Sequence, residues 1–459
     1  MREHFYGPRH LGVANVPDVN YPNVVNVSDI NSRLSAGGTS PGEFLPHLQD
    51  LRRSPRQFRF SFGLDTLPEE PGIIVVRGPR QYGKSTWLEQ QIEATIRTHG
   101  PGTAFYLNGD DVVSGPALAD AVREIIPLFR RDAPVRRLFI DEITAVADWQ
   151  RAVKRLVDGG SLRTVLVVTT GSKATDLRRG AERLPGRKGR LARTTYLFTP
   201  IAYAEFRRVC SAALGAQCLP AYLLTGGSPI ACGHIAEGRL PEYVIEIVKD
   251  WVYGECAQAG RHRSTLLALM ECLVRFGGTP VGQAKMARET GMANNSVAAG
   301  YLELLADLMC LSPAHAWDPA HRVALRRRPA KYHLSNTLAA LAWHPSRLRT
   351  IADFTALSPE AKGAWYEWAV AQELWRRRAI AGVEVPEELC FWQSKEHELD
   401  FVLAPGEFLE VKHGRTSPLE FAWFSRVFPK AHLTVISQSR YETANLTGIG
   451  LDEFLLQEG

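Results

Sequence analysis

The chain has 459 residues, of which 45% are hydrophobic and 22% are charged. These proportions are sufficient for several buried cores and exclude a disordered chain, and the length predicts about three domains. With 54 basic and 49 acidic residues the formal net charge is +5, which permits a nucleic-acid partner without requiring one.

The cysteines and the start of the chain indicate a cytoplasmic protein without membrane contact. Seven cysteines are scattered without a CxxC pair, which disfavours a disulfide framework and a zinc ribbon. No apolar run follows the start Met1-Arg2-Glu3-His4, so we expect no signal peptide. No stretch of about 18 apolar residues occurs, so we expect no membrane-spanning helix.

The first half of the chain predicts an irregular arm followed by an α/β domain. Residues 1–70 are rich in Asn, Pro, Gly and Ser, and we expect one helix near residues 44–52. In residues 71–231, short apolar runs alternate with amphipathic stretches, which is typical of a parallel sheet covered by helices on both faces. The predicted strands are 73–76, 104–107, 138–140 and 165–168.

Residues 78–85 read GPRQYGKS and fit the phosphate-binding pattern GxxxxGK[ST] at every fixed position. The pattern lies between a predicted strand and a helix, where glycines let backbone N–H groups wrap a phosphate at the helix N-terminus. We expect Lys84 to reach the β- and γ-phosphates of ATP and the Ser85 hydroxyl to bind Mg²⁺. The predicted ATP-binding residues are Gly78, Pro79, Arg80, Gln81, Tyr82, Gly83, Lys84, Ser85, Thr86 and Ser172.

Two carboxylates end the predicted strand 138–140, which we take to be the neighbour of strand 73–76. We expect Asp141 to hold Mg²⁺ through water and Glu142 to orient the hydrolytic water, which favours a hydrolase over a passive nucleotide sensor. Two solvated carboxylates that close a strand are the alternative. A further strand leads to Ser172, whose side chain would sense the γ-phosphate between the two sites.

A basic loop at residues 183–190 follows this strand. We name Arg187 as an arginine finger that stabilises transition-state charge in a neighbouring subunit, which implies a homo-oligomer. A solvated loop and a nucleic-acid contact are the alternatives.

Six short segments resemble one widespread prokaryotic group of ATPases. They are GPRQYGKS, LFIDEI with Asp148-Trp149 after it, TTGSKA, LPGR, FTP at 198–200 and TGGSP at 225–229. Over about residues 72–231 the chain is similar to the AAA-type module of that group. Its members typically carry a winged-helix segment and a C-terminal restriction-endonuclease-like domain. The arm is longer than this family usually shows. Gln81-Tyr82 stands where the family often has Arg-Val, which should not affect phosphate binding.

Residues 232–348 are expected to form a helical linker and a winged-helix domain. The expected elements are two helices, a basic wing and a return strand, at 284–290, 296–308, 321–328 and 331–334. The second helix would read DNA, but no Arg or Lys lies between residues 290 and 310, so partner docking is equally open. Arg326-Arg327-Arg328 would either contact phosphates or form a solvated charge run.

Residues 349–459 return to mixed helix and strand, with an expected hairpin at 391–412. If the turn centres on Pro405, Asp400 lies opposite Glu410, and side-chain alternation puts both on one face with Lys412. Two facing carboxylates favour a hard cation such as Mg²⁺ between them, and the lysine would position or polarise the attacking water. The side chains expected to face the core are Leu399, Phe401, Leu403, Leu409 and Val411.

The spacing D-x9-E-x-K resembles the PD-(D/E)xK nuclease superfamily, in which an upstream helix usually adds another carboxylate. We name Glu367 for that role, with Glu373 as the alternative. Leu399 stands where the superfamily name has Pro. The triplet Glu360-Ala361-Lys362 is a decoy because it lacks strand-forming flanks. An inactive descendant that only binds nucleic acid or packs on the ATPase is the alternative to a nuclease.

We therefore expect an α/β protein that hydrolyses ATP with Mg²⁺ as a homo-oligomer and couples this to Mg²⁺-dependent cleavage of DNA, in preference to RNA. Control of foreign DNA is the setting that analogy suggests. The expected catalytic residues are Glu142, Arg187, Glu367, Asp400, Glu410 and Lys412. The expected metal ligands are Ser85, Asp141, Asp400 and Glu410. The alternative is a nucleotide-operated switch whose C-terminal domains bind DNA or protein and cut nothing. A third hypothesis, an ATP-driven translocase, has less support, because the sequence shows no further DNA-tracking elements.

Overall fold

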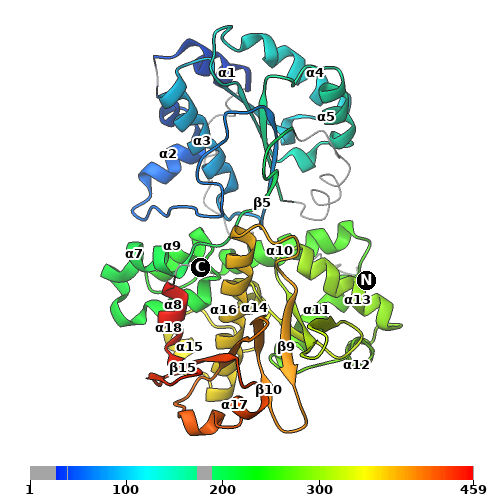
Figure 1. The fold of residues 1–459 in the computed structure, drawn as a ribbon. Coiled ribbons are helices and arrows are strands. Elements are labelled where there is room, and N and C mark those ends of the chain that lie inside the picture. Colours follow the sequence, from blue (N-terminus) through cyan, green and yellow to red (C-terminus); the bar gives the residue numbers. More distant parts are fainter. Residues whose placement is uncertain (1–26, 39, 173–188, 458–459) are drawn as a thin grey trace, which may run out of the picture.

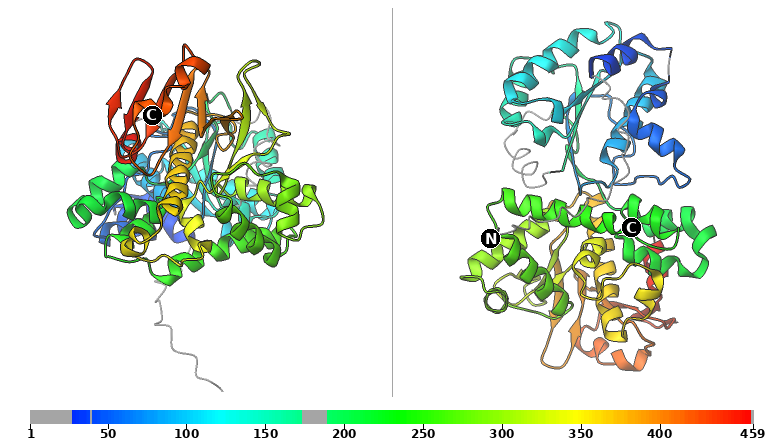
Figure 2. Two further views of the ribbon diagram at one scale, coloured as in Figure 1. Left: turned by 90° about the horizontal axis from the view of Figure 1, so that it is seen from below. Right: turned by 180° about the vertical axis from the view of Figure 1, so that it is seen from behind.

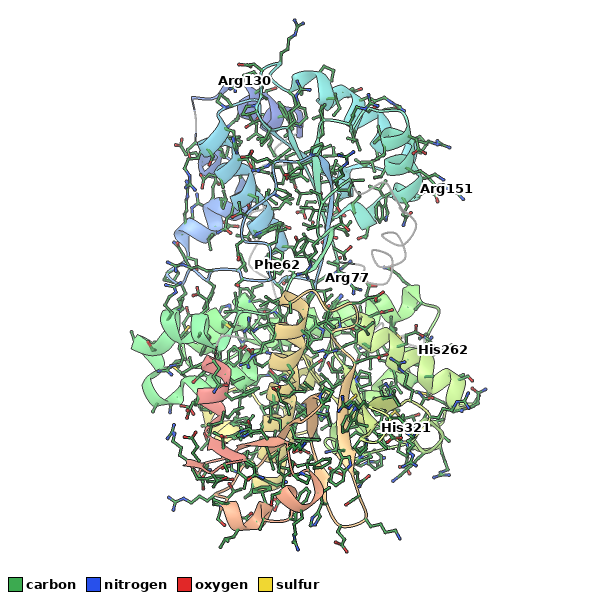
Figure 3. The ribbon with its side chains drawn as sticks, in the orientation of Figure 1. Phe62, Arg77, Arg130, Arg151, His262 and His321 are labelled. Carbon is green, nitrogen blue, oxygen red and sulfur yellow. The ribbon has the colours of Figure 1, made fainter. Side chains whose placement is uncertain are left out.

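The chain folds into two lobes that meet near the middle of the molecule (Figure 1). The computed structural model describes residues 27–38, 40–172 and 189–457. Elements up to β5 (Thr195–Leu197), drawn in blue to teal, form the upper lobe, and those from α7 (Tyr203–Leu214) onward form the lower lobe. The same division is visible from behind (Figure 2). Phe62 and Arg77 lie at the level where the lobes meet (Figure 3).

Residues 27–70 hold two α-helices where the sequence predicted one. The unexpected helix is α1 (Val27–Ala36), and α2 (Pro46–Arg53) is the helix expected near residues 44–52. Ile30, Leu34 and Leu48 of these helices are buried in the same cluster as one face of the central sheet. This segment is therefore part of the core of the upper lobe and not a separate arm.

The predicted parallel sheet forms the centre of the upper lobe, and it has five strands where four were expected. Its strands are β1 (Gly72–Arg77), β2 (Ala104–Asn108), β3 (Arg137–Asp141), β4 (Leu166–Gly171) and β5, in the order β2-β3-β4-β1-β5. The expectation that β3 lies beside β1 was wrong, because β4 lies between them. This order places the carboxyl end of β4 between the carboxyl ends of β3 and β1.

Helices cover both faces of this sheet, because neighbouring residues of a strand point to opposite sides. Ile73 and Val75 of β1 pack with α4 (Gly115–Ile125) and α5 (Trp149–Asp158). Ile74 and Val76 pack on the other face with α1, α2 and α3 (Lys84–His99). The unbroken apolar run of β1 is thus explained by burial on both sides.

The lower lobe begins with helices, as expected for residues 218–345. They are α7, α8 (Cys218–Thr225), α9 (Pro229–Ile235), α10 (Glu242–Gln258), α11 (Arg263–Arg275), α12 (Gln283–Glu289), α13 (Asn295–Asp307) and α14 (Thr337–Trp343). The helices α12 and α13 lie within one residue of the predicted pair. The apolar side chains of this region join one large buried cluster that continues into the C-terminal residues.

A second sheet crosses the boundary predicted between residues 348 and 349. Its strands are β6 (Ser312–Asp318), β7 (Val323–Leu325), β8 (Lys331–His333), β9 (Leu389–Gln393) and β10 (Glu398–Leu399). β6 pairs with β7 and β8 on the same side of that boundary and also runs parallel to β9 beyond it. The middle and C-terminal segments are therefore joined by a shared sheet.

The third sheet holds the second half of the expected hairpin. Its strands are β11 (Phe401–Ala404), β12 (Glu407–Val411), β13 (His432–Ile436), β14 (Tyr441–Glu442) and β15 (Leu446–Ile449), with α15 (Ile351–Thr355), α17 (Phe424–Val427) and α18 (Leu451–Leu456) outside it. The segment 391–412 therefore forms two hairpins in two sheets. Phe401 pairs with Leu409, which gives the expected register, but a shift after Val402 leaves Leu403 exposed to solvent. The expectation that Leu403 faces the core was wrong.

One long helix runs down the lower lobe from the level of the junction (Figure 1). It is α16 (Pro359–Ile380), whose Trp368, Ala371 and Trp375 are buried, whereas Ala364 is only partly buried. Among the helices that the structure describes, none has the length and apolar content needed to cross a membrane.

Candidate functional site

The turn between β1 and α3 is shaped by glycine at its two ends. α3 begins at Lys84, directly after Gly83, which has a left-handed φ of 96°. A Cβ atom on Gly78 would lie 2.7 Å from the Cβ of Phe198, so a larger residue does not fit there. Gln81 also has a positive φ of 60°, which is uncommon outside glycine and is typical of constrained functional loops. The turn therefore leaves the N-terminus of α3 uncovered by side chains of its own loop.

The Lys84 ammonium group lies inside this turn with only 4% of the residue exposed. In the described part of the chain it donates hydrogen bonds to two carbonyl oxygens, of Gly78 at 3.1 Å and of Pro79 at 2.8 Å. Burial lowers its pKa, although Glu142 and Asp141 oppose this effect. A buried cation with neutral carbonyl partners at a helix N-terminus fits a phosphate group, so the loop fits the phosphates of ATP.

The ends of β3 and β4 carry polar side chains that are bonded to one another. Asp141 is buried and accepts a hydrogen bond from the Thr170 hydroxyl. The Glu142 carboxylate accepts hydrogen bonds from both the amide and the hydroxyl of Ser172, each at 3.0 Å. Arg80 of the phosphate loop donates to the same Ser172 hydroxyl at 3.2 Å. Ser172 thus lies between the loop and Glu142, as predicted. Oxygen donors at this edge also suit Mg²⁺.

A cavity of about 940 Å³ opens at this edge, between the two lobes. Arg80, Lys84, Ser85, Glu142 and Ser172 are among the residues of the upper lobe that line it. Its other walls come from residues 47–60 and from α9 and the start of α10 in the lower lobe. The contribution of residues 47–60 and of the lower lobe could not be predicted, because neither segment carries a nucleotide-binding motif.

The segment before β1 forms one wall of the cavity and reaches both lobes. His47 forms a hydrogen bond of 2.9 Å with Glu89 of α3, and this bond raises its pKa. Arg56 pairs with Glu237 of the lower lobe at 2.9 Å. A Cβ atom on Gly83 would lie 2.5 Å from the ring of Phe60, so the ring packs directly on the phosphate loop.

Tyr82 connects the phosphate loop with the lower lobe. Its buried hydroxyl lies 3.2 Å from Oδ1 of Asn336, to which it donates a hydrogen bond. The same oxygen accepts from the amide of Ala339 at 3.1 Å and thereby caps the start of α14. The departure from the family pattern at Tyr82 therefore concerns contact between the lobes, and no motif could have indicated it.

Arg187, which the sequence predicted as an arginine finger, lies outside the described residues. Beyond that loop, Arg193 donates hydrogen bonds to the last carbonyls of α16, at 2.8 Å to Ile380 and 2.6 Å to Ala379. Its guanidinium also lies over the ring of Tyr196 in β5. Arg193 therefore links the edge strand of the upper sheet with the C-terminus of α16.

The carboxylates of the C-terminal hairpin face each other, as predicted. Asp400 and Glu410 are 4% and 5% exposed. The amide of Asp400 donates to Glu410 at 3.2 Å, and the amide of Val411 donates to Asp400 at 2.9 Å. The Lys412 ammonium lies 2.5 Å from the other oxygen of Glu410. The structure thus brings Asp400, Glu410 and Lys412 together.

Of the two helix carboxylates considered, α16 places Glu367 at this cluster and Glu373 elsewhere. Burial, together with the charges of Asp400 and Glu410, raises the pKa of Glu367 to about 8. Its Oε2 atom is buried without a hydrogen-bond partner among the described residues. Glu373 instead pairs with Arg376 at 2.8 Å and Arg377 at 2.7 Å. The decoy residue Lys362 is partly buried and donates to a carbonyl of its own segment, that of Thr355.

Lys331 of β8 also lies in this cluster and was not predicted as a site residue. Its ammonium is 2.7 Å from Asp400 and 2.5 Å from Glu398. Burial alone would lower its pKa, but the neighbouring carboxylates, chiefly Asp400 and Glu367, outweigh burial and raise it. The sequence gives no signal for this contact, because Lys331 and Asp400 are 69 positions apart and no motif links them.

The cluster fits Mg²⁺ only with help from other ligands. Within the ranges that the structure describes, no group of three or more His, Cys, Asp and Glu side chains is arranged to hold a metal ion. Asp400 and Glu410 supply two hard carboxylates, and Mg²⁺ commonly takes one or two carboxylates and keeps several waters or phosphate oxygens. The donor set therefore suits Mg²⁺ bound together with a substrate.

In the segment predicted as a winged helix, α12 and α13 form the expected helix pair, and β6 and β7 form an antiparallel hairpin. Asn294 caps α13 by accepting from the amide of Val297 at 3.0 Å. Arg326, in the expected wing, pairs with Glu388 next to β9. That arginine is therefore already bonded within the chain, whereas Arg327 and Arg328 are exposed.

The phosphate loop, its buried lysine and the carboxylates at the end of β3 define a P-loop ATPase domain. Residues 70–207 match the family model described as AAA domain, so the chain contains an AAA-type P-loop domain with an α/β fold. This match bears out the AAA-type part of the resemblance, and it does not extend to the winged-helix and nuclease-like segments. No curated protein matches the chain.

Several solved structures match parts of the chain at low similarity. A Walker-type ATPase of Pyrococcus abyssi is 12% identical and covers 66% of this chain and 94% of its own, with a TM-score of 0.40. The ORC2 protein of Aeropyrum pernix is 10% identical and covers 70% and 96%, with a TM-score of 0.37. RuvB of Thermotoga maritima is 17% identical and covers 56% and 85%, with a TM-score of 0.29. These similarities are too low to transfer a function.

Proposed function

We propose that the chain binds and hydrolyses ATP in its upper lobe and cleaves DNA with Mg²⁺ in its lower lobe. One observation carries the second half of this proposal: the partly buried Glu367 of α16 lies with the buried carboxylates of Asp400 and Glu410, and the half-exposed Lys412 pairs with Glu410. Asp400, Glu410 and Lys412 come from one hairpin and Glu367 from a helix upstream, and together they have the residue types that metal-assisted phosphodiester cleavage needs.

In the upper lobe, ATP would place its phosphates at the N-terminus of α3. Lys84 would exchange its bonds to the carbonyls of the loop for bonds to the β- and γ-phosphates. Mg²⁺ bound with ATP would neutralise phosphate charge, with Ser85 and Asp141 as its protein ligands.

The hydrolytic step would depend on Glu142, whose carboxylate is already oriented by Ser172. Glu142 would orient the attacking water, and Ser172 would sense the γ-phosphate, since it bonds to both Glu142 and Arg80. Arg187 of a neighbouring copy would stabilise the charge of the transition state, which requires a homo-oligomer.

In the lower lobe, Asp400 and Glu410 would hold Mg²⁺, which supplies Lewis-acid chemistry at the scissile phosphate when bound. Lys412 is about half exposed, with 49% of its side chain accessible, so it can meet a substrate at the surface. It would position the attacking water and stabilise negative charge on the phosphate. Glu367 would bind a water at the cluster through its unpartnered oxygen.

The DNA would also contact basic residues away from this cluster. Arg327 and Arg328 of the wing are exposed and would contact phosphates, whereas α13 lacks the basic residues that groove reading usually needs. We assign α12 and α13 to a winged-helix domain with a docking role. Cleavage under ATP control would suit a protein that acts on foreign DNA.

A second function is favoured by one contact. Because Lys331 pairs with Asp400, the cluster is partly neutralised without a metal ion. This arrangement also suits a nucleotide-operated switch in which the lower lobe binds DNA or a protein partner and nothing is cut.

The test is a cleavage assay with plasmid and linear DNA, with Mg²⁺ or Mn²⁺, and with or without ATP. We expect cutting that is lost in Lys412→Ala and altered in Lys84→Ala. The matched control is Lys362→Ala, which removes the lysine of the decoy triplet and should cut like the unmodified protein. ATP hydrolysis without cutting under any condition would overturn the nuclease assignment and support the switch.

A further inference from the structure

The carboxylate cluster contains a cation from a distant strand, β8 (Lys331–His333). The side chain of Lys331 in β8 is fully buried, with its ammonium 2.7 Å from Oδ1 of Asp400 and 2.5 Å from Oε1 of Glu398. A buried ammonium group is costly unless opposite charges or hydrogen-bond acceptors surround it. Lys331 is therefore the internal counterion of this cluster.

The contact also fixes the orientation of Asp400. One carboxylate oxygen of Asp400 accepts from Lys331, and the other accepts from the amide of Val411 at 2.9 Å. Together the two bonds prevent the carboxylate from rotating, while the amide of Asp400 donates to Glu410. Without Lys331, one oxygen would lose its donor and the carboxylate could turn.

The two lysines of the cluster have different surroundings. Lys412 is 49% exposed and pairs with Glu410, whereas the Lys331 side chain has no exposed surface. A substrate arriving from solvent can reach Lys412 and cannot reach Lys331. The buried lysine is thus suited to act on Asp400 and not on a substrate.

We propose that Lys331 is a positioning residue of the C-terminal site, which holds Asp400 towards Glu410 and keeps the carboxylates together until a divalent cation binds. The inference rests on the proposed nuclease function, since it concerns the same carboxylates. A divalent cation must share Asp400 with Lys331, and repulsion between the two cations lowers the affinity of the site. The same repulsion prevents tight metal binding before substrate phosphates contribute their charge.

The experiment is a calorimetric titration of the full chain with Mn²⁺, without nucleotide. Lys331→Gln keeps a hydrogen-bond donor for Asp400 and removes the positive charge, so we expect Mn²⁺ to bind at least about tenfold more tightly. Lys331→Arg keeps the charge, and its affinity should stay within about twofold of the unmodified protein. Adding Asp400→Asn to Lys331→Gln should abolish the gain. Thermal unfolding of each variant separates this effect from a loss of stability.

Four outcomes decide between the ideas. A tighter site in Lys331→Gln but not in Lys331→Arg supports Lys331 as the charge that must share Asp400 with the metal ion, even if no protein cuts DNA. If Lys331→Gln only lowers the unfolding temperature, while the unmodified protein binds Mn²⁺ and cuts, the inference fails and the nuclease survives. Absence of Mn²⁺ binding in every variant overturns both. If Lys331→Gln does not fold, Glu398→Gln replaces it. That change removes a counterion of Lys331 and should weaken Mn²⁺ binding, so an unchanged affinity contradicts the inference.

Discussion

Raising the pH is expected to destabilise the metal-free lower lobe. Burial, reinforced by the charge of Asp400, raises the pKa of Glu410 from 4.5 to about 8, and the same causes raise the pKa of Glu367 to about 8. The folded protein therefore holds protons on this cluster at neutral pH, which the unfolded chain releases.

The sign and size of the effect follow from these values. A carboxyl group whose pKa is higher in the folded state stabilises the fold fully below its unfolded pKa, and this contribution is lost as the pH rises through the folded pKa. The window therefore runs from 4.5 to about 8. Counting one proton, because Glu367 and Glu410 share one cluster, the free energy of unfolding falls by about 5 kcal/mol across it.

The assay is thermal unfolding of the metal-free protein between about pH 5 and about pH 9, followed by tryptophan fluorescence. Glu410→Gln carries no ionisable group there, so its unfolding temperature should depend less on pH than that of the unmodified protein. Glu396→Gln, on the exposed loop before β10, is the control and should behave like the unmodified protein. A temperature that does not fall with pH, or an equal slope in Glu410→Gln, would refute the reasoning.

Three further predictions concern the upper lobe and its junction. Tyr82→Phe removes the buried bond to Asn336 and should cost about 1 kcal/mol of stability in thermal unfolding while ATP affinity stays unchanged; a loss of ATP affinity contradicts the separation of the two roles. Lys84→Ala should weaken ATP binding at least about tenfold in a fluorescent-nucleotide titration, and near-normal binding would count against the phosphate site. Glu142→Gln should retain ATP binding and slow hydrolysis by about a hundredfold or more in a phosphate-release assay; undiminished hydrolysis would exclude Glu142 as the group that orients water.

Local patterns were sufficient to predict much of the fold. The apolar runs of β1 to β4 are continuous because both faces of each strand are buried, and the phosphate loop needs only its glycines, lysine and serine in sequence. The facing of Asp400 and Glu410 follows from a short hairpin with alternating side chains. In each case the interacting residues lie close together in the sequence.

What could not be predicted depends on contacts between distant segments. Lys331 and Asp400 are 69 positions apart, and Tyr82 and Asn336 are 254 positions apart. Glu367 and Glu373 lie on the same helix, and helical periodicity does not show which of them faces the sheet formed by residues further along the chain. The helix α1 has weak amphipathic character and is placed by packing on β2.

The contact of Arg193 with the end of α16 gives that helix a mechanical property. The 22 residues of α16 form a rod of about 33 Å, held at its C-terminus by a residue that precedes β5. Glu367 lies 13 positions before Ile380, or about 20 Å along the rod. A tilt of about 5° at the held end would move Glu367 by about 2 Å, which is the difference between a hydrogen bond and none. Through such a tilt, a small movement of the upper sheet would be passed along the helix to the carboxylates.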